Sequence, residues 1–454
     1  MAEALTARNA GLALLSGVLG EGLLLSQLLA DPAGPLAAMP GPERARAQRL
    51  AMQVLRQIEP VDRLLAPALR KVPPLAVMNI LRLAVVELAG GAAAHGVVNT
   101  AVETTRRGNR TGHLAGLVNA VLRTVSAQVQ VQAQVVGGDA ANPNLPAPTL
   151  TTAAQKLPRW LRQPLVHAYG REAVAAIEAV QANPPPLDLT LRARAAAGAG
   201  AGAEAGAGAE VGRGAEIPEG RLLPGGSLRL ADAGQVTALA GYAAGGWWVQ
   251  DAAAAMAVPL LALQPGEAVL DLCAAPGGKT LQMAASGAVV TALDISAPRM
   301  ARVAENLART GLAARLVVAD ALHWQPEALF DAVLLDAPCS ATGTIRRHPD
   351  LPFVKDGSEL AALLPLQAAL IDRALGFLKP GGRLVYCTCS LLPDEGEAQL
   401  AQALLRHPGL VVVRPDLPGI SPDWITPESG LRLRPDYWAD RGGMDGFFIA
   451  CLRK

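Results

Sequence analysis

Two cysteines lie in short turns, each of which follows an apolar run. Asp336-Ala-Pro-Cys-Ser340 places a carboxylate and a thiol on one turn, and Thr388-Cys389-Ser390 places a second thiol just after the run 384–387. A thiolate is both a nucleophile and a metal ligand, so the two could form a metal site, a redox pair, a nucleophile with a helper, or ordinary buried thiols. A Cys-x-x-Cys pair is absent, and His323 and His348 show no recognisable zinc-ligand spacing.

One reaction uses a carboxylate and two thiols together. Carbon 5 of cytosine is a poor nucleophile towards a methyl sulfonium, but addition of a thiolate at carbon 6 converts the ring into an enamine whose carbon 5 can take a methyl group. A carboxyl group that shares a proton with ring N3 would stabilise the developing charge. A second thiol could assist expulsion of the first. This set of residues therefore points to methyl transfer onto cytosine carbon 5.

A glycine turn follows the apolar run 268–272. Residues 273–280, Cys-Ala-Ala-Pro-Gly-Gly-Lys-Thr, end like a phosphate-binding Walker loop, but that loop needs a glycine where Cys273 stands. A glycine turn also lets the backbone approach a small ligand, and Asp294 at the end of the next run could hold the two hydroxyls of a ribose. Asp320, one run further, could meet an adenine edge. This is the layout of an adenosyl-cofactor site, and spacing alone leaves S-adenosylmethionine and a dinucleotide both open.

The elements that would position these residues alternate between strand and helix after residue 247. Because the short apolar runs are separated by helical stretches such as 301–307 and 360–378, they predict a doubly wound, mostly parallel α/β sheet. Ligands bind such sheets outside the carboxyl ends of the strands. The runs are 268–272, 289–293, 316–319, 332–335 and 384–387, and Asp294, Asp320, Asp336 and Cys389 all fall at their ends.

The rest of the chain divides into three expected segments. Residues 1–125 carry apolar side chains at helical spacing, including a helix over 50–65 that Pro60 could break. Residues 126–156 are polar and rich in Pro and Gly, as in a linker. Residues 157–246 predict a small α+β domain, in which the Ala/Gly stretch 195–216 has nothing bulky to bury and is expected to be a disordered surface insertion. The α/β domain would then span 247–454.

Composition narrows the class of protein. The 454 residues are 51% hydrophobic with a formal net charge of +1, yet charged residues interrupt every stretch long enough to span a membrane, which needs ~20 apolar residues. Five cysteines, all after residue 270, suit a reducing cytoplasm better than a disulfide framework. Residues 1–125 hold 13 Arg and Lys against 8 Asp and Glu. Their cluster Arg106, Arg107 and Arg110 is either an RNA contact or a solvated helix end.

Several motifs together resemble one family. The chain is similar throughout to the bacterial 16S ribosomal RNA cytosine-C5 methyltransferases of the Sun (Fmu) family, with a helical NusB-like domain at residues 1–125. The stretches that carry the resemblance are HGVVNTAVE (95–103), GLVNAVLR (116–123), NPPPLDLTLR (183–192), WVQDAAAAM (248–256), DLCAAPGGKT (271–280), DAPCSATGTIRRHPD (336–350), TCS (388–390) and GMDGFFIA (443–450).

The resemblance implies a role for each matching residue. Cys389 would be the nucleophile that attacks carbon 6, and Cys339 would help release the product. DNA cytosine-C5 methyltransferases resemble the opposite arrangement, so spacing alone does not rank the two thiols. Asp336 would also face the target base, and Arg346 and Arg347 would meet RNA phosphate. The S-adenosylmethionine contacts would be Cys273, Ala274, Ala275, Pro276, Gly277, Gly278, Lys279, Asp294, Asp320 and Asp336, with no metal.

The implied protein is a cytoplasmic monomer that acts on 16S rRNA or on an assembling small subunit. Its target base must lie in a loop or be flipped from the stack, because carbons 5 and 6 are otherwise covered. Three alternatives stay open: an RNA-binding assembly or antitermination factor with a weak catalytic half, a methyltransferase acting on tRNA, and a DNA cytosine methyltransferase. The intact pair Cys339 and Cys389 disfavours the first, and the NusB-like segment disfavours the last.

Overall fold

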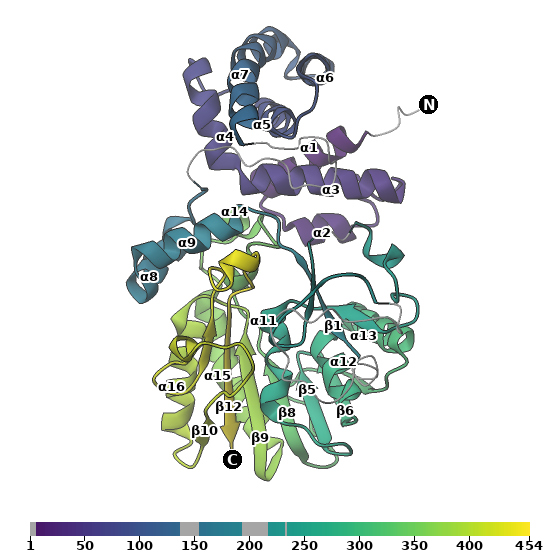
Figure 1. Cartoon of the computed structure of the whole chain (residues 1–454), viewed down its shortest axis with the longest axis vertical. Helices are drawn as coiled ribbons and strands as arrows, with labels where there is room; N and C mark the ends of the chain where they lie inside the picture. Colours follow the sequence, from purple (N-terminus) through teal and green to yellow (C-terminus); the bar gives the residue numbers. More distant parts are fainter. Residues whose placement is uncertain (1–5, 137–153, 193–216, 232–233) are drawn as a thin grey trace. The chain divides into compact units, whose positions relative to one another are not determined.

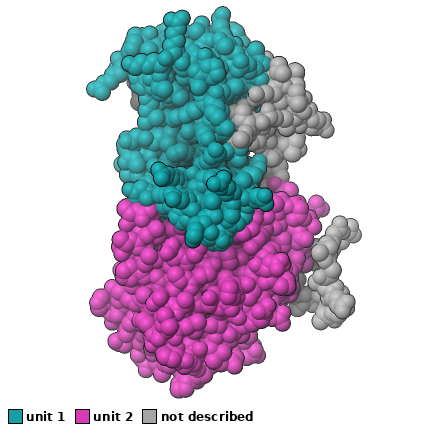
Figure 2. Space-filling model, turned by 90° about the vertical axis from the view of Figure 1, so that its left-hand side faces the viewer, with its two compact units in different colours: residues 1–184, 345–356 teal, residues 185–344, 357–454 magenta. Residues whose placement is uncertain are grey.

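The computed structural model describes residues 6–136, 154–192, 217–231 and 234–454, which form two compact units (Figures 1 and 2). Unit 1 comprises Met1–Pro184 together with Ile345–Asp356, and unit 2 comprises Pro185–Thr344 and Gly357–Lys454. A short piece of the α/β sequence thus belongs to the helical unit. The Ala/Gly stretch 195–216 and residues 137–153 of the expected linker lie outside the described residues.

Unit 1 is helical throughout its described part, as the sequence predicts. Its buried core consists of Leu, Val, Ile, Ala and Met side chains, which follows from the absence of any aromatic residue before Trp160. Phe353 and Val354, from the inserted piece, pack against that core. The helices are α1 (Ala7–Glu21), α2 (Leu25–Ala30), α3 (Gly41–Arg56), α4 (Ile58–Leu65), α5 (Leu75–Ala89), α6 (Ala94–Arg107), α7 (Ala115–Val136), α8 (Arg159–Tyr169), α9 (Arg171–Gln181) and α14 (Leu351–Val354).

The break expected at Pro60 occurs three residues earlier. Gln57 leaves the helical conformation, with φ −128° and ψ 18°, and separates α3 from α4. Pro60 is the third residue of α4. The first turn of a helix has no intrahelical partner for its N–H groups, so a proline there costs no hydrogen bond.

The described units divide the chain at other points than the segments expected from the sequence. Helix α7 continues beyond residue 125, and α8 and α9 belong to unit 1 rather than to the small sheet. Gln155 gives a physical reason, because its side chain donates to the Leu55 carbonyl and accepts from the Glu59 N–H. These bonds attach the segment that leads into α8 to the junction of α3 and α4.

A small antiparallel sheet opens unit 2. Its order is β2-β3-β1-β4, and Trp247 fills its core together with Leu189, Leu228 and Leu230. Arg229 and Asp188 form a buried two-bond ion pair between β3 and β1. The strands are β1 (Leu187–Leu191), β2 (Arg221–Leu222), β3 (Leu228–Leu230) and β4 (Trp247–Val249).

The second sheet of unit 2 has the order β10-β12-β9-β8-β5-β6-β7, and β11 pairs with β12. Pairs among β5 to β9 are parallel and those of β12 are antiparallel. Successive residues of β5, such as Val269 and Leu270, point to opposite faces of the sheet and pack into two different hydrophobic cores. The strands are β5 (Ala268–Leu272), β6 (Val289–Asp294), β7 (Arg315–Val318), β8 (Phe330–Asp336), β9 (Leu378–Thr388), β10 (Val411–Val413), β11 (Leu431–Leu433) and β12 (Phe447–Arg453).

The sheet is mostly parallel, as the sequence predicts, and this arrangement brings the candidate residues to one edge. Asp294 is the last residue of β6, Asp336 is the last of β8, and Cys389 directly follows β9. Because these strands run in the same direction, their carboxyl ends meet at the same edge. The helices of unit 2 are α11 (Ala252–Ala255), α12 (Gly278–Ala285), α13 (Ala297–Thr310), α15 (Leu360–Gly376) and α16 (Glu397–Arg406).

Candidate active site

The loop between β5 and α12 turns sharply at both of its ends. Cys273 has φ 61° and Gly277 has φ 103°, both in the left-handed region. A Cβ on Gly277 would come within 3.1 Å of Val303 on α13, so the glycine also permits close packing of loop and helix. The Ala274 N–H donates to the Leu293 carbonyl at 3.1 Å. The loop is therefore attached to the end of β6.

Asp294 provides a second attachment. Its two carboxylate oxygens accept the backbone N–H groups of Ala275 (3.2 Å) and Ser296 (2.9 Å), and Arg299 lies 3.6 Å away. The Asp294 side chain is only 2% exposed.

Asp320 differs from Asp294, because its carboxylate is exposed and pairs with His323. The backbone N–H of Leu322 and the His323 side chain lower the pKa of Asp320. Both carboxylates lie at the strand edge where the sequence places them.

A buried lysine connects the glycine turn to β8. The Lys279 Nζ lies 2.8 Å from the Asp336 carboxylate and 5.1 Å from the centre of the Phe447 ring. Burial is the largest single effect and lowers the pKa of Lys279, but the Asp336 carboxylate and the nearby thiols of Cys387 and Cys389 together outweigh it and raise that pKa. The lysine side chain is 9% exposed and that of Asp336 31%. The carboxylate is thus the accessible member of this ion pair.

The two thiols predicted to act together do lie together. The Sγ atoms of Cys339 and Cys389 are 3.4 Å apart, although 50 residues separate them in the chain. The hydrogen bond with Cys389 and burial raise the pKa of Cys339 well above its usual value. A third thiol is close, because Cys387 Sγ lies 3.6 Å from the Asp336 carboxylate, and burial raises its pKa as well.

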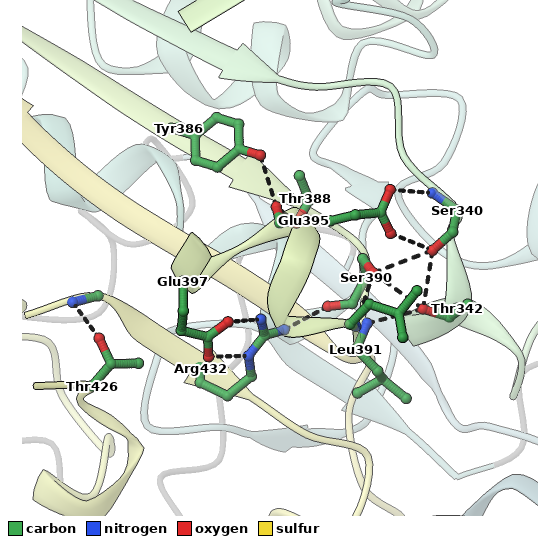
Figure 3. A network of polar contacts seen from close by, with 12 residues as sticks. Ser340, Thr342, Tyr386, Thr388, Ser390, Leu391, Glu395, Glu397, Thr426 and Arg432 are labelled. Carbon is green, nitrogen blue, oxygen red and sulfur yellow. Dashed lines mark hydrogen bonds and ion pairs between the residues drawn. The ribbon is translucent and has the colours of Figure 1, made fainter. Parts of the chain in front are cut away.

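A set of hydrogen bonds holds both thiol turns (Figure 3). The buried Glu395 carboxylate accepts the Ser340 N–H and hydroxyl, and the Glu395 carbonyl accepts the Thr388 hydroxyl. The Ser340 hydroxyl also lies 3.2 Å from the Ser390 hydroxyl. Ser340 directly follows Cys339, and Thr388 and Ser390 flank Cys389, so these bonds fix the residues next to each sulfur.

Comparison with known proteins finds relatives of similar sequence. A family model described as 16S rRNA methyltransferase RsmB/F matches residues 258–453, and a NusB family model matches residues 6–127. The ribosomal RNA small subunit methyltransferase B of Salmonella arizonae is 37% identical over 347 residues, which cover 75% of this chain and 73% of that protein. The chain belongs to the RsmB/F family of 16S rRNA methyltransferases.

Solved structures agree with this assignment. The crystal structure of PH0851 superposes with a TM-score of 0.67 at 21% identity and covers 98% of both chains, which shows a common fold. A methyltransferase homologue from Pyrococcus horikoshii is 26% identical with a TM-score of 0.50, and the match covers 64% of this chain and 93% of that one. Both the family resemblance and the fold class predicted from the sequence are confirmed.

RsmB/F proteins are S-adenosylmethionine-dependent methyltransferases, and the strand-end residues fit that cofactor. Its ribose hydroxyls and adenine amine are hydrogen-bond donors, and its sulfonium is a cation. The edge supplies three carboxylates, Asp294, Asp320 and Asp336, of which Asp336 pairs with Lys279 and Asp294 lies 3.6 Å from Arg299. Carboxylate oxygens accept such donors and attract such a cation.

The expected cofactor role of Asp294 can be tested by its effect on affinity. Asp294→Ala removes the acceptor of the Ala275 N–H and should weaken S-adenosylmethionine binding by ~1–3 kcal/mol, the scale for losing a charged hydrogen-bond partner. Isothermal titration without RNA measures this change. The control is Asp331→Ala, because Asp331 accepts the Ala268 N–H at the opposite end of β8 and pairs with Lys379. An unchanged dissociation constant for Asp294→Ala would remove Asp294 from the cofactor site.

Asp271, under the same loop, should make stability depend on pH. Burial raises its pKa to about 7, against the opposing hydrogen bond from Thr280 and the charge of Lys279. An unfolded aspartate titrates near 3.9, so between the two pKa values the folded state binds the proton more tightly than the unfolded state does. The resulting contribution to the free energy of unfolding is complete below ~pH 4 and is lost as pH rises through about 7. Asp271→Asn should therefore gain up to ~4 kcal/mol relative to wild type between pH 4 and 8. Urea unfolding at both pH values tests this, and an equal pH dependence in both proteins would contradict it.

The arginines expected to contact RNA lie in different environments. Arg346 is 1% exposed inside unit 1, and its carbonyl accepts a hydrogen bond from the guanidinium of Arg56. Arg347 is half-buried. Arg106 and Arg107, at the end of α6, are 64% and 60% exposed and pair with Glu103, and Arg110 is exposed. Of these five arginines, Arg106, Arg107 and Arg110, here called the α6 cluster, are the exposed ones.

Two residues close to the thiol turns, Cys387 and Glu395, are not identified from the sequence motifs. Cys387 could have been found from strand periodicity, because residues i and i+2 of β9 share a face and so place it beside Cys389. Glu395 has no such signal, since a single glutamate in a turn resembles a surface residue. Among the described residues, no three His, Cys, Asp or Glu side chains are grouped to hold a metal ion, and no helix is long and apolar enough to cross a membrane.

Proposed function

We propose that the chain transfers the methyl group of S-adenosylmethionine to carbon 5 of a cytosine in 16S rRNA through a covalent bond between Cys389 and carbon 6. The observation that supports this most directly is the 3.4 Å separation of the Cys339 and Cys389 sulfurs, next to the accessible carboxylate of Asp336. Neither an RNA-binding module nor a methyltransferase acting on nitrogen needs two thiols in contact.

The carboxylate prepares the base. Asp336 accepts a hydrogen bond from the exocyclic amine of cytosine. A proton taken up from solvent and held between its carboxylate and ring N3 neutralises the negative charge that develops when the thiolate adds to carbon 6. Lys279 keeps the Asp336 carboxylate oriented through its 2.8 Å ion pair. Burial of Lys279 leaves the carboxylate as the group that meets the base.

The thiols make and break the adduct. The Cys389 thiolate bonds to carbon 6, and carbon 5 then takes the methyl group that the cofactor carries on its sulfonium. Cys339 next passes its own proton to the departing Cys389 sulfur and takes the carbon 5 proton in return. The carbon–sulfur bond breaks as the 5,6 double bond forms, so a methyl group has replaced one proton. The raised pKa of Cys339 means that this thiol enters the step protonated, as transfer of its proton to the departing sulfur requires.

The implied setting follows from the family. The substrate is an exposed or flipped cytosine in 16S rRNA, either free or in an assembling small subunit, and the enzyme acts as a cytoplasmic monomer. Contacts to phosphate by the α6 cluster, Arg106, Arg107 and Arg110, would add affinity without sequence preference.

Tritium release tests the position of the methyl group. With 16S rRNA labelled at cytosine carbon 5, each methyl group transferred should release one tritium, because the carbon 5 proton is the atom replaced. Transfer without tritium release would place the methyl group elsewhere on the RNA. Parallel reactions with tRNA and duplex DNA test the substrate, and methylation of either in preference to 16S rRNA would overturn that part of the proposal. Bisulfite sequencing of rRNA from cells lacking the protein locates the cytosine.

A further inference from the structure

Glu395 is a fully buried acid that the proposed reaction does not use directly. It lies in the turn between β9 and α16, and its side chain has no ion-pair partner among the described residues. Its carboxylate instead accepts three hydrogen bonds, from the Ser340 N–H, the Ser340 hydroxyl and the Gln367 amide. All three contacts are donors, as an ionised carboxylate requires. A buried charge is costly, so a function for it has to be sought.

The contacts of Glu395 surround Cys339 on both sides. Gln367 donates to the Pro338 carbonyl at 2.9 Å and to the Glu395 carboxylate at 2.9 Å. The Glu395 carboxylate accepts the Ser340 N–H at 2.8 Å. The residues before and after Cys339 are thus both held, and the sulfur between them has little freedom to move.

The same residue also holds the second thiol turn. The Glu395 carbonyl accepts the hydroxyl of Thr388, which precedes Cys389, and that of Tyr386 (Figure 3). The Cys389 carbonyl in turn accepts the Gly343 N–H, in the segment that follows Cys339. One buried residue therefore contacts the turn of each sulfur, through its side chain on one side and its backbone on the other.

The charge of Glu395 acts on Cys339. The hydrogen bond with Cys389, burial, and the negative charges of Cys389 and Glu395 all raise the pKa of Cys339. Burial, charge and hydrogen bonds together favour the protonated form of Cys339.

We propose that Glu395 is a positioning residue that fixes the two thiol turns in register and, by its charge, keeps Cys339 protonated until the adduct breaks down. This rests on the proposed function, since it assigns Cys339 the proton that the departing sulfur receives. Glu395 touches neither the RNA nor the cofactor in this assignment. Its effect reaches the reaction through the position and the proton of Cys339.

Substitution separates position from charge. Glu395→Gln keeps the size of the side chain but turns one of its two oxygens into a donor, either the one that accepts the Ser340 N–H and the Gln367 amide or the one that accepts the Ser340 hydroxyl. In either case kcat should fall by about 100-fold, the scale for misplacing a reacting group by about 1 Å. KM for S-adenosylmethionine should change little. Glu395→Asp keeps the charge and shortens the side chain. The control for lost stability is Asp331→Asn, at the opposite end of β8. A Glu395→Gln kcat within threefold of wild type would overturn the positioning role.

Alkylation without RNA tests the charge and does not depend on turnover. In a Cys389→Ser background, the pH at which iodoacetamide modifies Cys339, followed by peptide mass spectrometry, should move to lower pH with Glu395→Gln and stay in place with Glu395→Asp. An unmoved midpoint for Glu395→Gln would overturn the role of the charge. The wild-type tritium assay keeps the two proposals apart, because its failure would remove the proposed function while this midpoint would still report on Glu395.

Discussion

Replacing Cys389 with alanine should abolish methyl transfer to RNA while leaving S-adenosylmethionine binding nearly intact. The variant loses the atom that bonds to carbon 6, and carbon 5 then stays too weak a nucleophile for the methyl group. The expected fall in turnover is at least about 10⁴-fold, in line with removal of other covalent nucleophiles. Single-turnover transfer of a tritiated methyl group to 16S rRNA measures the fall.

A second cysteine of the same sheet provides the control. Cys451 is buried on β12, and its thiol donates to the Leu260 carbonyl at 3.4 Å. Cys451→Ala should therefore lower stability without a comparable loss of turnover. Cofactor affinity reports on the fold of both variants. Retained turnover in Cys389→Ala, with folding shown by cofactor binding, would remove Cys389 as the nucleophile.

The edge of the sheet could be predicted from the sequence, because parallel strands impose it. Once the apolar runs near Asp294, Asp336 and Cys389 are assigned to parallel strands, their ends must converge, whatever the loops between them do. Strand order adds what spacing cannot provide: β8 pairs with both β5 and β9, so the turn after β8 lies beside that after β9. The contact of the two sulfurs follows from that adjacency.

The environment of Arg346 could not be predicted in this way. Its segment follows the Asp-Ala-Pro-Cys turn, and two adjacent arginines there resemble a phosphate contact. In the structure residues 345–356 belong to the helical unit, where Asp350 accepts the Leu25 N–H and Phe353 packs against the helical core. Membership of a unit depends on contacts between residues 290 or more positions apart in the sequence, which local patterns do not encode.

Glu395 illustrates the same limit inside the site. The role proposed for Glu395 depends on three hydrogen-bond donors from two other segments of the chain. Two of the donors belong to Ser340, after β8, and the third is the Gln367 amide on α15. The sequence shows only a glutamate in a proline-containing turn, where a solvated carboxylate is the usual expectation. Burial, a tertiary property, converts that residue from surface acid to buried acceptor.

Replacing Cys339 with alanine should trap the enzyme on its RNA. The Cys389–carbon 6 bond and methyl transfer need no atom of Cys339, so the adduct should still form. Its breakdown needs a proton for the departing sulfur and an acceptor for the carbon 5 proton, and the thiol 3.4 Å from Cys389 is the group placed to supply both. A protein–RNA band that survives denaturing electrophoresis should therefore accumulate, with methyl label in it.

The double variant determines which sulfur carries the bond. Cys339→Ala with Cys389→Ala should show no band, since no nucleophile remains, whereas Cys339→Ala with Cys451→Ala should show the same band as Cys339→Ala alone. A band in Cys389→Ala and none in Cys339→Ala would reverse the two roles and give the arrangement in which the thiol of the Asp-Ala-Pro-Cys turn attacks. The contact between the sulfurs allows either order, so this comparison decides which turn holds the nucleophile.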